Sequence, residues 1–304
     1  MTRSYSPRPR PVACLLMGAV LAFGAGCARR ESDAAARPPA APGEVRHPLK
    51  GEVVDVSRER KALIVLHDEI KGYMPRMTME FRVTEGDLAI AKPGQRIRAE
   101  LVERKGEYFL ERIWPDDPLT NEAVGAATKA LTQDTAMRGR GVYREVGETA
   151  PDFTLLDQEG RAVAAHRFRG RHVVVNFIFT RCPIATMCPA ATTRMMALQD
   201  AARQAGRELE LVSISLDPEY DTPGVLKEYA AGRGIDTANF TFLTGPDAAV
   251  RNLLAQLGVI REFEGETIKH TLATVLIDPA GRIIHRVDGS AWDPAEFLGK
   301  VKQP

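Results

Sequence analysis

The hydrophobic positions of the chain follow two patterns that change near residue 145. In the first pattern, short apolar runs alternate with turns, and Gly51–Ser57 and Lys61–His67 have the composition of strands. Further short strands are predicted at 81–83, 96–102 and 108–113, with turns at Pro93-Gly94 and Lys105-Gly106. Several short strands within residues 46–115 predict a small all-β, OB-like barrel.

The second pattern, in residues 146–304, alternates near-continuous apolar runs with amphipathic runs. Val173–Phe179 is typical of a buried parallel strand, and Ala191–Ala205 has apolar positions at helical spacing. Strands are also predicted at 209–215, 240–243, 271–277 and 283–287, and helices at 223–232, 248–257 and 294–301. This order of elements predicts an α/β thioredoxin-like domain.

Residues 116–145 join the two predicted domains. Asn121–Met137 is rich in alanine and is predicted to form a helix, which Gly139–Gly141 ends. The polar character of the segment favours a linker that acts as a spacer over a third core.

The first 27 residues have the features of an export signal. A charged start with three arginines precedes Val12–Gly26, which is uncharged and mostly apolar. This run is shorter than the roughly 20 apolar residues of a transmembrane helix. Small residues precede Cys27, as in a bacterial lipobox, so we expect lipidation at Cys27 and a membrane-anchored periplasmic protein; soluble release and an uncleaved anchor are the alternatives. Residues 28–45 are predicted to be a disordered tether.

Composition and charge exclude one class of partner. The formal net charge is +1, and no basic patch with interleaved aromatic residues occurs. The chain therefore lacks the electrostatic field that recruits nucleic acid.

The cysteines define a candidate site in the second domain. Of four cysteines, Cys14 and Cys27 lie in the signal, which leaves Cys182 and Cys188. Two thiols in an oxidising compartment indicate a disulfide, a metal site, or both in turn. Pro189 suits a first helical turn, so Cys188 is predicted at a helix N-terminus, where the dipole lowers a thiol pKa. Two thiolates select Cu(I) or Zn, and His270 is the candidate third ligand.

Each of these residues also has a plainer interpretation. The two cysteines could form a structural disulfide, and His270 could be a hydrogen-bonded surface histidine. Asp217 and Asp221 suit a turn and a helix cap before Pro223, or could support the metal ligands.

Residues 147–302 resemble the Sco/SenC copper-chaperone family. The matching elements are Ala150-Pro-Asp-Phe, Phe179-Thr-x-Cys-Pro, Cys188-Pro, Ser215-Leu-Asp-Pro-x-x-Asp-Thr-Pro223, and His270 before a hydrophobic strand. The resemblance implies that the two cysteines and the histidine bind one copper ion. It also implies delivery of copper to the binuclear site of cytochrome c oxidase, or reduction of its cysteines. This chain has five residues between its cysteines, whereas the family usually has three.

A second candidate site lies in the predicted barrel. Met77 and Met79 alternate in a strand and therefore share a face, and His67 ends the preceding strand. Thioethers suit Cu(I) or Ag(I), although methionines can also be core filler. Residues 48–113 resemble the periplasmic metal-binding barrel CusF through His67-Asp-x-Ile and Pro75-x-Met-Thr-Met-x-Phe81. In that family a Trp at this position covers the metal by a cation–π contact, and this chain has Met74 instead. Met74 is therefore either a further thioether ligand, or the metal site lacks this aromatic cover.

The two sites together predict a copper relay from the Met/His site to the Cys/Cys/His site. The expected partner is the copper-bearing subunit of cytochrome c oxidase or another periplasmic cuproprotein. A periplasmic thiol–disulfide oxidoreductase and a copper-resistance buffer are the alternatives, so catalytic activity stays open. A peroxiredoxin is disfavoured, because Phe179 and Ala185 stand three positions before the cysteines, where that family has Thr.

Overall fold

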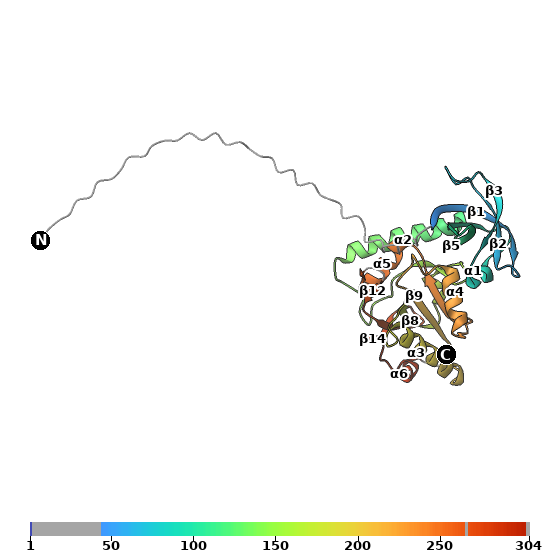
Figure 1. The fold of residues 1–304 in the computed structure, drawn as a ribbon. Helices are drawn as coiled ribbons and strands as arrows, with labels where there is room; N and C mark the ends of the chain where they lie inside the picture. Colours follow the sequence, from blue (N-terminus) through green and yellow to red (C-terminus); the bar gives the residue numbers. More distant parts are fainter. Residues whose placement is uncertain (2–43, 265–266, 302–304) are drawn as a thin grey trace. The chain divides into compact units, whose positions relative to one another are not determined.

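The computed structural model describes residue 1, residues 44–264 and residues 267–301 (Figure 1). The predicted signal, Cys27 and nearly all of the tether lie outside the described residues. Residues 44–301 belong to one compact unit. In the part of the chain that the structure describes, no helix combines the length and the apolar character needed to cross a membrane.

The first domain is a closed barrel of five strands, in the order β1-β2-β3-β5-β4. The strands are β1 (Val45–Ser57), β2 (Ala62–His67), β3 (Met77–Arg82), β4 (Arg96–Arg104) and β5 (Glu107–Pro115). Side chains that alternate inward, among them Leu49, Val53 and Leu63, fill its core. The barrel prediction is confirmed, and β1 is longer than its pattern indicated.

The barrel also holds a short helix that the sequence pattern did not predict, α1 (Glu85–Ile90). Thr84 caps it by accepting a hydrogen bond from the Asp87 amide. Only six residues form this helix, and they include Gly86, so neither length nor propensity reveals it.

The second domain is built on a seven-stranded sheet in the order β14-β13-β8-β9-β10-β6-β7. Its strands are β6 (Thr154–Asp157), β7 (Ala162–Ala164), β8 (His172–Ile178), β9 (Leu209–Ser215), β10 (Phe240–Thr244), β13 (Ala273–Ile277) and β14 (Ile283–Asp288). Its helices are η1 (Ala165–Phe168), α3 (Cys188–Gln204), α4 (Pro223–Gly232), α5 (Asp247–Gln256) and α6 (Pro294–Lys300). Strands β8, β9 and β10 are parallel, so their carboxyl ends meet at one edge of the sheet. The thioredoxin-like prediction is confirmed.

A second, two-stranded sheet consists of β11 (Arg261–Glu264) and β12 (Thr267–His270). This hairpin, like the β6–β7 pair, was not predicted. Among the described residues its strands pair only with each other, and β12 ends at His270.

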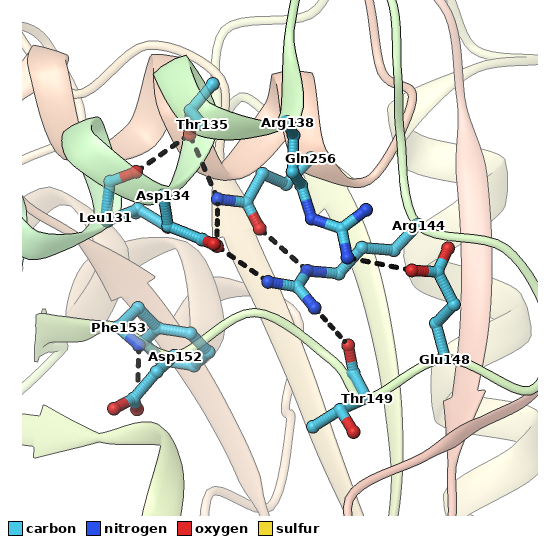
Figure 2. A network of polar contacts seen from close by, with 10 residues as sticks. All are labelled: Leu131, Asp134, Thr135, Arg138, Arg144, Glu148, Thr149, Asp152, Phe153 and Gln256. Carbon is cyan, nitrogen blue, oxygen red and sulfur yellow. Dashed lines mark hydrogen bonds and ion pairs between the residues drawn. The ribbon is translucent and has the colours of Figure 1, made fainter.

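Helix α2 (Pro118–Arg138) joins the two domains. Only two of its side chains are fully buried, Val124 and Leu131, and the first packs with Trp114 of the barrel and Leu156 of β6. Polar contacts add to its attachment, and Figure 2 shows the network around Arg144. Arg144 donates to Asp134 of α2 at 2.6 Å and to Gln256 of α5 at 2.7 Å. The connecting helix is therefore packed on the second domain.

The barrel contacts the second domain through helices α1 and α4. A Cβ on Gly86 would overlap the carbonyl of Gly224, and a Cβ on Gly224 would overlap the Asp87 carboxylate. Glycine is thus required on both sides of this close approach. Together with α2, this contact joins the barrel to the second domain.

Candidate metal centre

The thiol site lies where the first parallel strand of the second domain turns into a helix. Strand β8 ends at Ile178, the chain passes through a loop that holds Cys182, and α3 begins at Cys188. The helix begins three residues earlier than its apolar pattern indicated, because Pro189 can occupy the first turn without losing a hydrogen bond. Cys188 is fully buried, whereas Cys182 is partly exposed, and both are free thiols.

His270 of β12 completes a group of three ligand atoms. The two Sγ atoms and one imidazole nitrogen all lie within 4.8 Å of one another. The Cys188 thiol donates to Nε2 of His270 at 3.6 Å, while Nδ1 of the same ring donates to the Thr271 carbonyl at 3.1 Å. That second bond fixes the tautomer, so Nε2 presents its lone pair to the cysteines. The structure brings together the three residues that the sequence singled out.

Without a metal, burial shifts the pKa values of Cys188 and His270 toward their neutral forms. It raises the pKa of the Cys188 thiol, and the nearby Cys182 raises it further. Burial also lowers the pKa of His270, against the effect of the Thr271 carbonyl. Burial of Cys188 therefore opposes the effect of the helix dipole, which by itself favours the thiolate. A soft cation would supply the missing positive charge and displace the thiol protons.

Asp217 and Asp221 hold the loop that carries Cys182. Asp221 is fully buried and accepts hydrogen bonds from the Thr180 hydroxyl at 2.5 Å and from the Thr180 amide at 3.2 Å. Asp217 accepts from Arg181 Nε at 2.7 Å. Both contacts lie directly before Cys182. Neither carboxylate caps α4, since Thr222 does so.

The far side of the same loop has its own attachment. The Ser290 hydroxyl donates to the Thr186 carbonyl at 2.7 Å. The loop between the cysteines, two residues longer than in the Sco/SenC pattern, is therefore held at both ends. The sequence did not predict this role of Ser290, because more than a hundred positions separate Ser290 from Thr186.

Arg261 is a second residue that the sequence did not reveal. It lies directly across the β11–β12 pair from His270, and its side chain is 6% exposed. Its guanidinium donates to the Leu216 carbonyl at 2.9 Å and to the Asp247 carboxylate at 2.6 Å. These bonds fasten the His270-bearing hairpin to the carboxyl edge of the main sheet.

The barrel site is built from the paired strands β2 and β3. His67 lies opposite Met77, and Val65 lies opposite Met79. The His67 ring is fully buried, and its Nδ1 donates to the Asp68 carbonyl at 2.8 Å. Its buried Nε2 has no hydrogen-bond partner. A buried imidazole nitrogen without a partner is costly unless something else coordinates it, so this atom fits a metal ligand.

The methionines around His67 differ in exposure. Met77 is 42% exposed, whereas Met79 is partly buried and packs against the barrel core. Met74 also packs against that core, in the connection between β2 and β3, where its backbone bridges to Ile70. Packing of Met74 against the core is consistent with a purely structural role as well as with a third thioether ligand.

Comparison with known proteins identifies both domains. Residues 142–303 match the family model for SCO1/SenC, and residues 46–115 match the model for the copper binding periplasmic protein CusF. The SCO1 protein homolog of Bacillus subtilis is 31% identical over 170 residues, which cover 54% of this chain and 86% of that protein. A SCO2-like protein of Rickettsia typhi is 29% identical over 166 residues, 52% of this chain and 79% of that protein. The solved structure of BsSco, described as a member of the Sco family of cytochrome c oxidase assembly proteins, has a TM-score of 0.46 at 26% identity, covering 52% of this chain and 96% of its own.

Proposed function

The chain belongs to the SCO1/SenC family, and we propose that it is a periplasmic copper chaperone with a copper site in each domain. The observation that carries the proposal is the convergence of Cys182, Cys188 and His270, whose ligand atoms lie within 4.8 Å. Two thiolates and one imidazole form a soft, three-coordinate donor set that suits Cu(I). The same three residues leave room for a change of oxidation state, since imidazole also binds Cu(II).

The second site strengthens the proposal because its donors suit the same metal. His67 offers a buried Nε2 without a partner, and Met77 and Met79 offer thioethers from the facing strand. Thioethers need no deprotonation, so this site can take Cu(I) over a wide pH range. The match of this domain to a copper binding periplasmic protein supports both the metal and the compartment.

Ligand strength gives the pair of sites a direction. Thiolates bind Cu(I) more tightly than thioethers, so copper captured on the barrel would move to the cysteines. The resemblance to Sco/SenC proteins supports the copper-bearing subunit of cytochrome c oxidase as the final recipient. We further propose that the N-terminal segment exports the chain and that a lipid on Cys27 anchors it to the membrane.

Deleting the gene tests the delivery role. We expect cytochrome c oxidase activity to fall, and to return with the wild-type chain or with added copper. The Cys182→Ser/Cys188→Ser variant should not restore it. Unchanged oxidase with increased copper sensitivity would instead identify a resistance buffer. Rescue by a thiol reductant but not by copper would identify a thiol–disulfide oxidoreductase.

A further inference from the structure

The segment 68–76 joins the two strands that carry the candidate ligands of the barrel. It begins directly after His67, at the end of β2, and ends directly before Met77, at the start of β3. It also contains Met74, whose sulfur is either a third thioether ligand or part of the core packing. The contacts that hold this segment in place therefore also set the surroundings of a metal in the barrel.

The middle of the segment is a closed turn. The Ile70 amide donates to the Met74 carbonyl at 2.9 Å, and the Met74 amide donates to the Ile70 carbonyl at 3.0 Å. Ile70 is 5% exposed and belongs to the barrel core, against which Met74 and Met79 also pack. Two thioethers thus pack against one hydrophobic cluster, and the turn sets the position of one of them.

Tyr73 fastens this turn to two other strands of the barrel. Its hydroxyl donates a hydrogen bond to the carboxylate of Glu103 on β4. Its ring stacks on the ring of His47 on β1, with the centroids 4.0 Å apart and the planes at 23°. Strands β1 and β4 pair with each other, whereas the segment itself joins β2 to β3. The segment therefore reaches across this end of the barrel.

His47 and Glu103 lie on the inward face of their strands at this same end. His47 is two positions before Leu49, and Glu103 is two positions after Leu101; both leucines belong to the core. His47 lies opposite Leu101 in the β1–β4 pair, so the two polar side chains are neighbours. Glu103 forms no ion pair with the described residues, so no cation competes with the Tyr73 hydroxyl for its carboxylate.

We propose that Tyr73 is a positioning residue of the barrel copper site and that it acts through Met74. Fastened to β1 and β4, it keeps the turn in the conformation in which the Met74 thioether joins the other ligands around Cu(I). Its own hydroxyl is engaged with Glu103 and supplies no ligand. The site then has one imidazole and three thioethers, all neutral donors that suit Cu(I). This inference rests on the proposed function, because it requires copper in the barrel.

The test uses the full chain with all four cysteines replaced by serine, so that the thiol site cannot bind Cu(I). Tyr73→Phe removes the hydroxyl that donates to Glu103 and keeps the ring. Titration against a competing Cu(I) chelator should show binding that is weakened about tenfold or more, the usual effect of losing a contact that orients a ligand. Tyr143→Phe is the matched control, because Tyr143 is exposed and lies outside the barrel. It should leave the affinity unchanged.

Glu103 provides the same comparison without a change at Tyr73. Glu103→Leu removes the hydrogen-bond acceptor and should weaken Cu(I) binding as much as Tyr73→Phe does. Glu103→Gln keeps an acceptor and should retain most of the affinity. Far-UV circular dichroism of each variant verifies that the barrel is folded.

Met74→Leu separates the positioning role from a general effect on the barrel. It conserves the packing and removes the sulfur, so X-ray absorption should show two sulfur atoms bound to copper in place of three. In the Met74→Leu background, Tyr73→Phe should weaken binding no further, because the ligand that Tyr73 positions is absent.

Three results would overturn the inference. One is a Tyr73→Phe chain that binds Cu(I) as tightly as its parent. A second is a loss of affinity on Tyr73→Phe that is equal with and without Met74→Leu, because Tyr73 would then act on the barrel as a whole. A third is a parent chain with only two sulfur atoms bound to copper. A parent chain that binds no Cu(I) at all would instead refute the barrel site of the proposed function.

Discussion

Replacing Asp87 by asparagine should remove a pH-dependent loss of unfolding free energy that arises at the contact between the barrel and the second domain. The Asp87 carboxyl is 3% exposed and is packed against Gly224 of α4. Its Oδ2 accepts a hydrogen bond from the Thr84 hydroxyl at 2.9 Å, but Oδ1 has no partner. Burial raises its pKa from 3.8 to about 7, and the negative charge of Glu228 adds to this effect.

The sign of the pH dependence follows from this direction. Between about pH 4 and pH 7, the folded state keeps the Asp87 proton while the unfolded state has lost it. The unfolded state then binds fewer protons, so the free energy of unfolding falls as pH rises through this window. A shift of roughly 3 pH units at about 1.4 kcal/mol each corresponds to about 4 kcal/mol at pH 8, as an order of magnitude.

Urea unfolding of the wild type and of Asp87→Asn at pH 4, 6 and 8 measures this effect. Trp114 emission, in a Trp292→Phe background, reports on the barrel and its boundary. The stability advantage of Asp87→Asn should grow by about 4 kcal/mol from pH 4 to pH 8. Asp55→Asn, on an exposed carboxylate of β1, is the control. An advantage of Asp87→Asn that is equal at all three pH values would refute the reasoning.

Three further substitutions test contacts on which the account depends. Gly224→Ala should cost about 1–3 kcal/mol of unfolding free energy, because its methyl overlaps the Asp87 carboxylate; no change in urea midpoint would contradict the close contact. Arg144→Met should cost about 1–3 kcal/mol and speed hydrogen exchange in α2, because it removes the hydrogen bonds of Arg144 to Asp134, Gln256 and the Thr149 carbonyl; unchanged exchange would show that α2 is held otherwise. Arg261→Met should weaken binding of Cu(II) at least tenfold and change its electron paramagnetic resonance spectrum, with Arg261→Lys in between, because the hairpin no longer presents His270; an unaltered spectrum would remove the positioning role.

Much of the fold could be predicted from the sequence because the hydrophobic period is strong. The apolar run at 173–179 and the helical spacing at 191–205 each identify their elements, and both domains follow from the order of such runs. The β11–β12 hairpin could not be predicted, because the sequence Arg261-Glu-Phe-Glu264 is too charged to have the pattern of a strand. The packing of α2 on the second domain could not be predicted either, because it depends on a polar network between segments that are distant in the sequence.

The candidate ligands were predictable from residue type and spacing, but their surroundings were not. Sequence position placed Cys188 at a helix N-terminus, whereas only the folded structure shows that Cys188 is fully buried, which raises the pKa of its thiol. Asp217 begins a turn, as the sequence indicated, but neither carboxylate caps α4: that of Asp217 accepts from Arg181 and that of Asp221 accepts from Thr180. Such contacts join residues from different strand ends, which a local pattern cannot reveal.

Cu(I) stoichiometry on the reduced chain tests the central claim most directly. With Cys14 and Cys27 replaced by serine, titration against a competing Cu(I) chelator should give two equivalents bound per chain. Cys182→Ser/Cys188→Ser and Met77→Leu/Met79→Leu should each lose one equivalent and retain the other. Binding that is unaffected by the cysteine substitutions would contradict the account, because the Cys182, Cys188 and His270 group would then not be a copper site.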